Sequence, residues 1–118
     1  MKLSITLKDK VHRKNGGFNM KNNPINQLQE LMIITAEECG ELVQRCSKII
    51  RKYSHKKQIE EDQRIKLVEE IGDVYCMIHL MVEQGITNWD ELERRMNVKR
   101  DKLKIWSSLV SNENQKGE

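Results

Sequence analysis

Apolar side chains recur every three or four residues over most of this 118-residue chain. Such spacing is typical of amphipathic helices. It predicts a first helix from about residue 23 to residue 53, with Asn23 as the N-cap and Pro24 at the first helical position. The apolar positions of this helix are 28, 31, 32, 36, 39, 42, 43, 46, 49 and 50.

Two further helices follow from the same pattern. One is predicted from about residue 60 to residue 84, where Gly85 supplies a C-terminal stop. The next is predicted to begin after Thr87 and Asn88, with Thr87 as N-cap and Asp90 as its acidic N3 residue, and to run to about residue 109. A fourth short helix is expected only if the first or the third helix breaks. The predicted fold is all-α, and its first two helices form an antiparallel hairpin.

Two segments of this hairpin have nearly the same sequence. Residues 37–43 read EECGELV, and residues 69–75 read EEIGDVY. The glycine stands at the same place in each copy, where it costs about 1 kcal/mol of helix stability relative to alanine. Two such costs in one register suggest that another backbone, a metal or a substrate comes close at these points.

The acidic residues of each copy lie three positions apart, which places them on one helix face. The pairs are Glu38 with Glu41, and Glu70 with Asp73. An acidic face is usually just solvated, but each pair here continues an apolar stripe instead of lying opposite it. The stripes run through positions 31, 34, 38, 41, 45 and 48, and through 66, 70, 73, 77 and 80. Four carboxylates partly buried between helices would repel one another unless a cation held them.

The residue types around the motifs narrow the choice of cation. A di-iron carboxylate bundle would carry Glu-x-x-His, and neither His55 nor His79 has a glutamate three residues before it. The three cysteines form no C-x-x-C pair, so zinc is not indicated. An all-oxygen set suits Mg²⁺ or Mn²⁺. Because Mg²⁺ commonly bridges to substrate phosphates and the chain has no glycine-rich phosphate loop, metal and basic side chains are expected to hold the phosphates.

Basic side chains stand near the predicted metal ligands. Lys48 lies seven positions beyond Glu41 on the same helix face, and Arg51 follows it. A second basic cluster near the end of the last helix contains Lys99 and Lys102. A solvated helix surface is the alternative interpretation for each of them.

Taken together, these residues resemble the MazG-like branch of the all-α nucleoside triphosphate pyrophosphohydrolases. The resemblance covers about residues 24–106. It includes the lead-in INQLQE at 25–30, both acidic motifs, and CSKIIR at 46–51. It is strongest with the short, single-domain members common in phages and bacteria. It implies an antiparallel helical bundle that forms a dimer or a dimer of dimers.

The resemblance also implies an enzyme of nucleotide-pool control. Such an enzyme uses Mg²⁺, or Mn²⁺ in its place, to hydrolyse a nucleoside triphosphate to the monophosphate and pyrophosphate. The implied metal ligands are Glu38, Glu41, Glu70 and Asp73. Glu37 is the first candidate for the base that takes a proton from the attacking water, and Glu41 is the second.

Substrate recognition is expected to involve the basic side chains and one tryptophan. Lys48, with Lys99 or Lys102, would stabilise charge on the leaving pyrophosphate. Arg51 and Trp106 complete the expected substrate-binding set. Related phage enzymes act on dGTP, so a purine deoxynucleotide such as dGTP is the favoured substrate. The sequence leaves open which phosphorus is attacked.

The two ends of the chain differ in kind from the helical region. Residues 1–21 hold six basic residues and one acidic residue, whereas residues 111–118 form a polar tail. The catalytic domain is therefore placed at residues 22–110. The basic arm is an added segment before a natural start at Met20, a segment that packs on a neighbouring subunit, or a disordered end.

Composition indicates the compartment. Three cysteines, all at apolar helix positions, predict buried thiols in a reducing compartment. The chain has no signal peptide and no apolar run near 18 residues, which predicts a cytoplasmic protein without a membrane partner, in the host cytoplasm if a phage encodes it.

Two other functions remain open on the sequence. The basic arm could bind nucleic acid, with Trp89 and Trp106 as stacking platforms for bases. The chain could also be a catalytically inactive interaction module on the same fold. Activity with Mg²⁺ would separate this last function from the enzyme.

Overall fold

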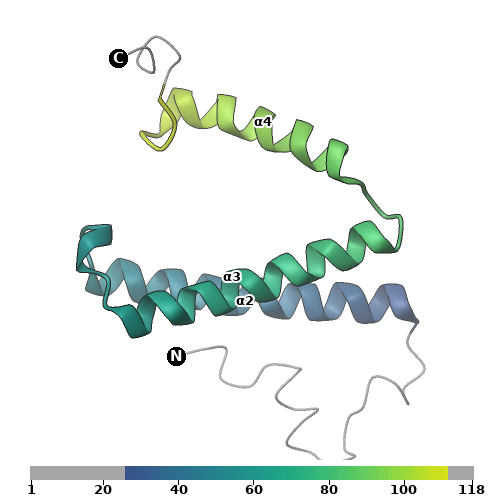
Figure 1. The fold of residues 1–118 in the computed structure, drawn as a ribbon, viewed down its shortest axis with the longest axis horizontal. Helices are drawn as coiled ribbons and strands as arrows, with labels where there is room; N and C mark the ends of the chain where they lie inside the picture. The colour runs from purple at the N-terminus through teal and green to yellow at the C-terminus, as the bar shows by residue number, and fades with distance from the viewer. Residues whose placement is uncertain (1–25, 112–118) are drawn as a thin grey trace, which may run out of the picture. The chain divides into compact units, whose positions relative to one another are not determined.

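The computed structural model describes residues 26–111, and it is all-α over that range, as predicted. The described residues form α2 (Gln27–Lys52), α3 (Glu61–Glu83) and α4 (Trp89–Trp106), with a short 3₁₀ helix, η2 (Lys56–Gln58), between the first two. Figure 1 shows α2 and α3 side by side. The chain divides into two compact units, Met1–Leu80 and Met81–Glu118. The predicted basic arm (1–21) and most of the polar tail lie outside the described residues.

Helix α2 begins with a reciprocal cap. The Gln29 amide donates to Asn26 Oδ1 at 2.8 Å, and the Asn26 amide donates to Gln29 Oε1 at 3.1 Å. This capping box satisfies two backbone donors at once. Asn23 and Pro24 lie outside the described residues, but the prediction that this helix is capped at Asn23 is wrong, because its N-cap is Asn26, in an extended conformation. The predicted end near Tyr53 is confirmed, since Tyr53 is the C-cap.

Helix α3 ends at the glycine that the sequence marked. Gly85 has a φ of +76°, in the left-handed region that a residue without Cβ adopts at little cost. The Gly85 amide donates to the Val82 carbonyl, and the Ile86 amide donates to the Met81 carbonyl, each at 3.0 Å. These two bonds form a Schellman motif, so the predicted stop is confirmed.

Helix α4 begins after Asn88, as predicted, but its N-cap is not the predicted residue. Its N-cap is Asn88, whose Oδ1 accepts from the Glu91 amide at 2.9 Å. The prediction of Thr87 as the cap, with Asp90 at N3, is therefore wrong. Thr87 instead donates from its hydroxyl to the Glu91 carboxylate at 3.1 Å. Asn and Thr both cap helices well, so their order alone could not fix the register.

The end of α4 also differs from its prediction. The helix stops at Trp106, not near residue 109, because Ser107 adopts an extended conformation with a φ of −146°. The Ser107 amide and hydroxyl both donate to the Leu103 carbonyl, at 2.9 and 2.8 Å. Neither α2 nor α4 breaks within the described residues, and the extra short element is η2 instead.

A polar clamp closes the connection between α2 and α3. Lys52 Nζ lies 2.8 Å from Glu60 Oε1, and the Tyr53 hydroxyl donates to the same oxygen at 3.0 Å. The hydrogen bond from the Lys52 ammonium, followed by that from Tyr53, lowers the pKa of Glu60. The same contact with Glu60 raises the pKa of Lys52. The clamp joins the last residue of α2 to the residue before α3, so it favours the antiparallel hairpin.

The interior of this hairpin is mostly charged. Among the described residues, the buried apolar side chains are Leu31 and Met77. The buried charged side chains are more numerous: Glu37, Glu38, Glu41, Arg45 and Glu70. Charged side chains are rarely buried unless they are paired or bind a metal. The interface between the helices therefore contains a cluster of charged side chains as well as apolar ones.

The two stripes proposed from the sequence are the faces that become buried. Positions 31, 34, 38, 41, 45 and 48 of α2 are all buried or half-buried, as are 70, 73, 77 and 80 of α3. Lys66, at the start of the second stripe, is exposed. The prediction that the carboxylates continue the apolar stripes is confirmed.

The prediction that the three cysteines are buried is wrong. Cys39, Cys46 and Cys76 are all exposed free thiols. A hairpin of two helices covers one face of each helix, and these three residues lie at its edges or on the open sides.

Within the described residues, no helix is apolar over a length sufficient to cross a bilayer.

Large apolar side chains remain on the open faces of the hairpin. The sequence also predicts a subunit interface formed by apolar residues beside the carboxylate line: Met32, Ile33, Met77, Ile78, Leu80 and Met81. Of these, Met32 is exposed, Met77 is buried inside the hairpin, and the others are half-buried. The most exposed apolar face of α3 lies elsewhere, along Ile65, Val68, Ile71 and Tyr75. A single hairpin thus leaves apolar surface on the side of α3 that the prediction did not name.

Candidate metal centre

The carboxylates of the two motifs come together between α2 and α3. Glu37, Glu38 and Glu41 form one group, and Glu41, Glu70 and Asp73 form a second. Within each group, one carboxylate oxygen of every residue lies within 4.8 Å of the others. Glu41 belongs to both groups, so it links the ligands predicted on α2 with those predicted on α3.

Burial makes this arrangement energetically demanding. Glu38 and Glu41 are 3% exposed, and Glu70 is 1% exposed. At an effective dielectric constant near 20, two unit charges at about 4 Å interact with an energy of roughly 4 kcal/mol. Several like charges at this range destabilise the hairpin unless positive charge compensates them.

The local sequence explains which acids turn inward. Glu70 is buried, whereas its neighbour Glu69 is exposed, because successive residues of a helix point about 100° apart. Asp73, three residues further on, returns to the inner face and is half-buried. The doubled acids of the second motif therefore divide into one inner and one outer carboxylate. In the first motif Glu37 and Glu38 are both buried.

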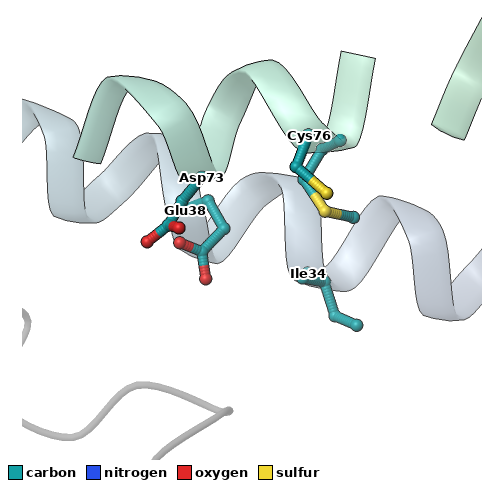
Figure 2. A pocket seen from close by; sticks show the side chains of 5 residues that line it. Ile34, Glu38, Asp73 and Cys76 are labelled. Carbon is teal, nitrogen blue, oxygen red and sulfur yellow. The ribbon is translucent and has the colours of Figure 1, made fainter. Parts of the chain in front are cut away.

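A small hollow adjoins the carboxylates. It measures about 180 Å³ and is lined by Ile34, Glu38, Asp73, Cys76 and Met77. Figure 2 shows the carboxyl groups of Glu38 and Asp73 close together and pointing the same way, with Ile34 further along α2 and Cys76 reaching in from α3. The hollow thus has an acidic end and an apolar end.

The glycine of the second motif is not packed closely against any described residue. A Cβ built at Gly72 would meet nothing within 4 Å among the described residues. The space beside α3 at this point is open. Close approach of a metal, a substrate or another subunit at this glycine stays a prediction.

Arg45 is the residue of this region to which the sequence gave no role. It is 4% exposed, and its Nη1 donates to Gln63 Oε1 at 3.1 Å across the hairpin. It lies four residues after Glu41, on the same stripe. That register was the available signal, but a basic residue on a helix is far more often solvated.

The predicted substrate-binding residues fall into two sets. Lys48 is half-buried on the inner face of α2, in register with Glu41, whereas Arg51 is exposed. Lys99, Lys102 and Trp106 are exposed residues of α4, in the second compact unit.

The tryptophans of α4 are both accessible. Trp106 is 65% exposed and Trp89 is 44% exposed. Lys99 Nζ lies over the Trp106 ring, 5.1 Å from its centroid, in a cation–π contact. One face of the Trp106 ring is therefore already covered by a cation.

Comparisons with known proteins add no relative. No protein-family model matches the chain. No curated protein and no solved structure is significantly similar to it. The likeness to the MazG-like enzymes therefore rests on the two acidic motifs and their flanks.

Proposed function

We propose that this protein is a Mg²⁺-dependent nucleoside triphosphate pyrophosphohydrolase. The observation that carries the proposal is the convergence of Glu41 with Glu70 and Asp73 from two antiparallel helices. Glu38 joins the same set through the first acidic group, in which it lies close to Glu41. The four residues are the ligands that the resemblance to the MazG-like family assigns.

The side chains present fit an oxygen-preferring divalent cation. The two groups contain carboxylates only, with no thiol or imidazole among them. Carboxylate oxygens are the ligands that Mg²⁺ and Mn²⁺ take in proteins. When bound, such a cation neutralises phosphate charge and lowers the pKa of a coordinated water.

The general base and one positive charge for the polyphosphate come from side chains of the first unit. Glu37 is buried beside Glu38 and Glu41 in the first acidic group. We assign to Glu37 the role of general base, which accepts a proton from the attacking water. Glu41 is the second candidate for this base. Lys48, half-buried in the same register, supplies positive charge for the polyphosphate.

The nucleoside end of the substrate has an apolar surface available. The hollow continues from Glu38 and Asp73 to Ile34, Cys76 and Met77, so a sugar or base placed there would contact non-polar side chains. A purine deoxynucleotide such as dGTP remains the favoured substrate. Arg51, Lys99, Lys102 and Trp106 stay as further proposed contacts.

Assembly and location complete the proposal. We expect a dimer or a dimer of dimers, acting in the cytoplasm of a cell or of a phage-infected host. The exposed apolar face along Ile65, Val68, Ile71 and Tyr75 supports association. A second subunit would cover surface that the single hairpin leaves open.

Release of pyrophosphate tests the proposal. The protein is incubated with each common ribo- and deoxyribonucleoside triphosphate, with Mg²⁺, with Mn²⁺ and with a chelator. Hydrolysis of at least one nucleotide to monophosphate and pyrophosphate, lost with the chelator, supports the enzyme. Absence of hydrolysis for every nucleotide and both metals leaves an inactive interaction module as the better account.

Truncation separates the enzyme from the nucleic-acid binder. A protein that starts at Met20 lacks most of the basic arm but keeps every carboxylate of the two groups. The enzyme should retain its metal-dependent hydrolysis. A nucleic-acid binder should instead lose a strongly salt-dependent affinity for DNA or RNA, because each phosphate contact adds to that salt dependence.

A further inference from the structure

The burial of the Arg45 charge is not explained by its hydrogen-bond partner, Gln63. Only 4% of the residue is exposed, and a guanidinium stays protonated in proteins. Its Nη1 donates to the neutral side-chain amide of Gln63 at 3.1 Å. Its Nε is also buried, and no acceptor within residues 26–111 lies within hydrogen-bond distance of it. The Gln63 amide fixes the position of the guanidinium but supplies no negative charge.

The compensating charge is available from the acidic groups. Burial of an isolated ion destabilises a protein, and a nearby ion of opposite sign offsets that effect. Glu41 lies four residues before Arg45, one helical turn away on the same buried stripe. Glu41 is itself 3% exposed and belongs to both acidic groups. The charges of Arg45 and the carboxylates therefore lower each other's cost of burial.

We infer that Arg45 is a positioning residue for the acidic groups. Its hydrogen bond to Gln63 crosses from α2 to α3, and its charge offsets part of the repulsion around Glu41. Together these effects keep the two helices close enough for the carboxylates to converge before any cation binds. The inference rests on the proposed function only for the part played by the cation.

This role predicts how Arg45 and a cation interact energetically. Without a cation, Arg45 supplies positive charge to the acidic groups from within the chain. A bound cation also offsets the repulsion between the carboxylates, so the positive charge of Arg45 then contributes less to stability. A residue that merely filled space would contribute equally in both states.

A double-mutant cycle in metal-free protein tests the charge coupling. Arg45→Met keeps the side chain long and flexible but removes its charge, and Glu41→Gln removes the neighbouring charge. Urea unfolding is measured for the wild type, both single variants and the double variant. Arg45→Met should reduce the folding equilibrium constant at least about tenfold more when Glu41 is intact than in the Glu41→Gln background. An equal loss in both backgrounds would overturn the inference.

Two further variants isolate charge from other effects. Arg64→Met is the matched control, because Arg64 is an exposed arginine that pairs with Glu61 at 2.7 Å, and its effect should be the same in both backgrounds. Arg45→Lys keeps the positive charge and should lie nearer the wild type than Arg45→Met. If lysine is as damaging as methionine, charge compensation is not the role of Arg45.

A second experiment, with added Mn²⁺, distinguishes the proposed cation site from the proposed role of Arg45. Saturating Mn²⁺ should reduce the destabilisation caused by Arg45→Met several-fold, whereas an unchanged or larger loss would contradict the inference. If Mn²⁺ does not stabilise even the wild type, the proposed cation site fails, and the metal-free cycle still decides the role of Arg45. If Arg45→Met does not fold alone, Glu41→Gln or Mn²⁺ should restore folding, and failure of both counts against the inference.

Discussion

Glu41 of α2 and Glu70 of α3 meet in one acidic group, with carboxylate oxygens within 4.8 Å, although both side chains are almost completely buried. The antiparallel hairpin creates this relationship, because it returns the second motif to the level of the first. Two ionised carboxylates in such a place are costly unless a positive charge is present. The charge on these residues should therefore control both the stability and the activity of the protein.

The first prediction concerns stability without metal. Glu70→Gln removes one buried charge, so in the presence of a chelator it should unfold at a higher temperature than the wild type. A gain of about 1 kcal/mol corresponds to roughly 4–8 °C for a domain of this size. Thermal unfolding followed by circular dichroism measures the shift.

The neighbouring residue provides the control for this comparison. Glu69→Gln changes an exposed carboxylate in the same motif, so its melting temperature should stay close to that of the wild type. A metal-free Glu70→Gln protein that is less stable than the wild type would indicate a structural role for the Glu70 carboxylate.

The second prediction concerns assembly. The apolar face of α3 along Ile65, Val68 and Ile71 is exposed in the single chain, and a second subunit would remove it from water. Light scattering at micromolar concentration should therefore report a dimer or a larger assembly. Val68→Lys should shift the equilibrium towards monomer. A wild-type monomer at this concentration would contradict the prediction.

The inner face of the hairpin could be predicted from the sequence with good accuracy. Stepping by three and four residues from Glu38 and from Glu70 selects positions that, apart from Lys66, the fold buries or half-buries. The helix ends at Tyr53 and Gly85 also followed from local signals, because a cap or a left-handed glycine acts within a few residues. Periodicity and end signals are local, so one sequence suffices for them.

Features that depend on what covers a helix could not be predicted in this way. Cys39, Cys46 and Cys76 lie at apolar positions of their helices, yet a hairpin leaves them exposed. Arg45 differs, since its place on the stripe through Glu41 indicated an inner position, but its hydrogen bond to Gln63 on the facing helix could not be read from one helix. The exposure of the cysteines and the partner of Arg45 both depend on which neighbour the chain brings to that face.

The third prediction uses the clamp between Lys52 and Glu60. The lowered pKa of Glu60 means that the clamp adds stability above the ordinary glutamate pKa of about 4.3, and loses it as the pH falls through the lower, folded value. The raised pKa of Lys52 means that its contribution is present below about pH 10.4, and is lost as the pH rises through the folded value.

Thermal unfolding at several pH values measures this dependence. Glu60→Gln should melt slightly below the wild type at pH 7, and the difference should vanish in strong acid, where the wild-type carboxyl is protonated. The pair is exposed, so added salt should also reduce the difference. A gap of the same size at neutral and strongly acid pH would show that the charge of Glu60 is not responsible.

The fourth prediction concerns the hollow beside the carboxylates. Cys76 is an exposed thiol that lines it next to Asp73, so a maleimide attached to its sulfur should obstruct the space. In a variant that keeps Cys76 but carries alanine at the other two cysteine positions, alkylation should abolish most nucleotide hydrolysis. A bound nucleotide should slow the reaction of the thiol.

A variant that keeps only Cys46 serves as its control. Cys46 is also exposed, but it is not among the residues that line the hollow. Its alkylation should leave most activity in place. Equal inactivation of the two variants would remove the support that the hollow gives to the substrate site.

The most direct measurement is the rate of pyrophosphate release with Mg²⁺, compared between Glu70→Gln, Glu69→Gln and the wild type, with dGTP tested first. The wild type should produce monophosphate and pyrophosphate in equal amounts, without free phosphate at early times. Loss of the buried carboxylate should reduce the rate by more than about 100-fold, because even residues that only support metal ligands contribute roughly 10–100-fold. Glu69→Gln should keep nearly the wild-type rate. A Glu70→Gln protein that turns over at close to the wild-type rate under saturating Mg²⁺ would contradict the account.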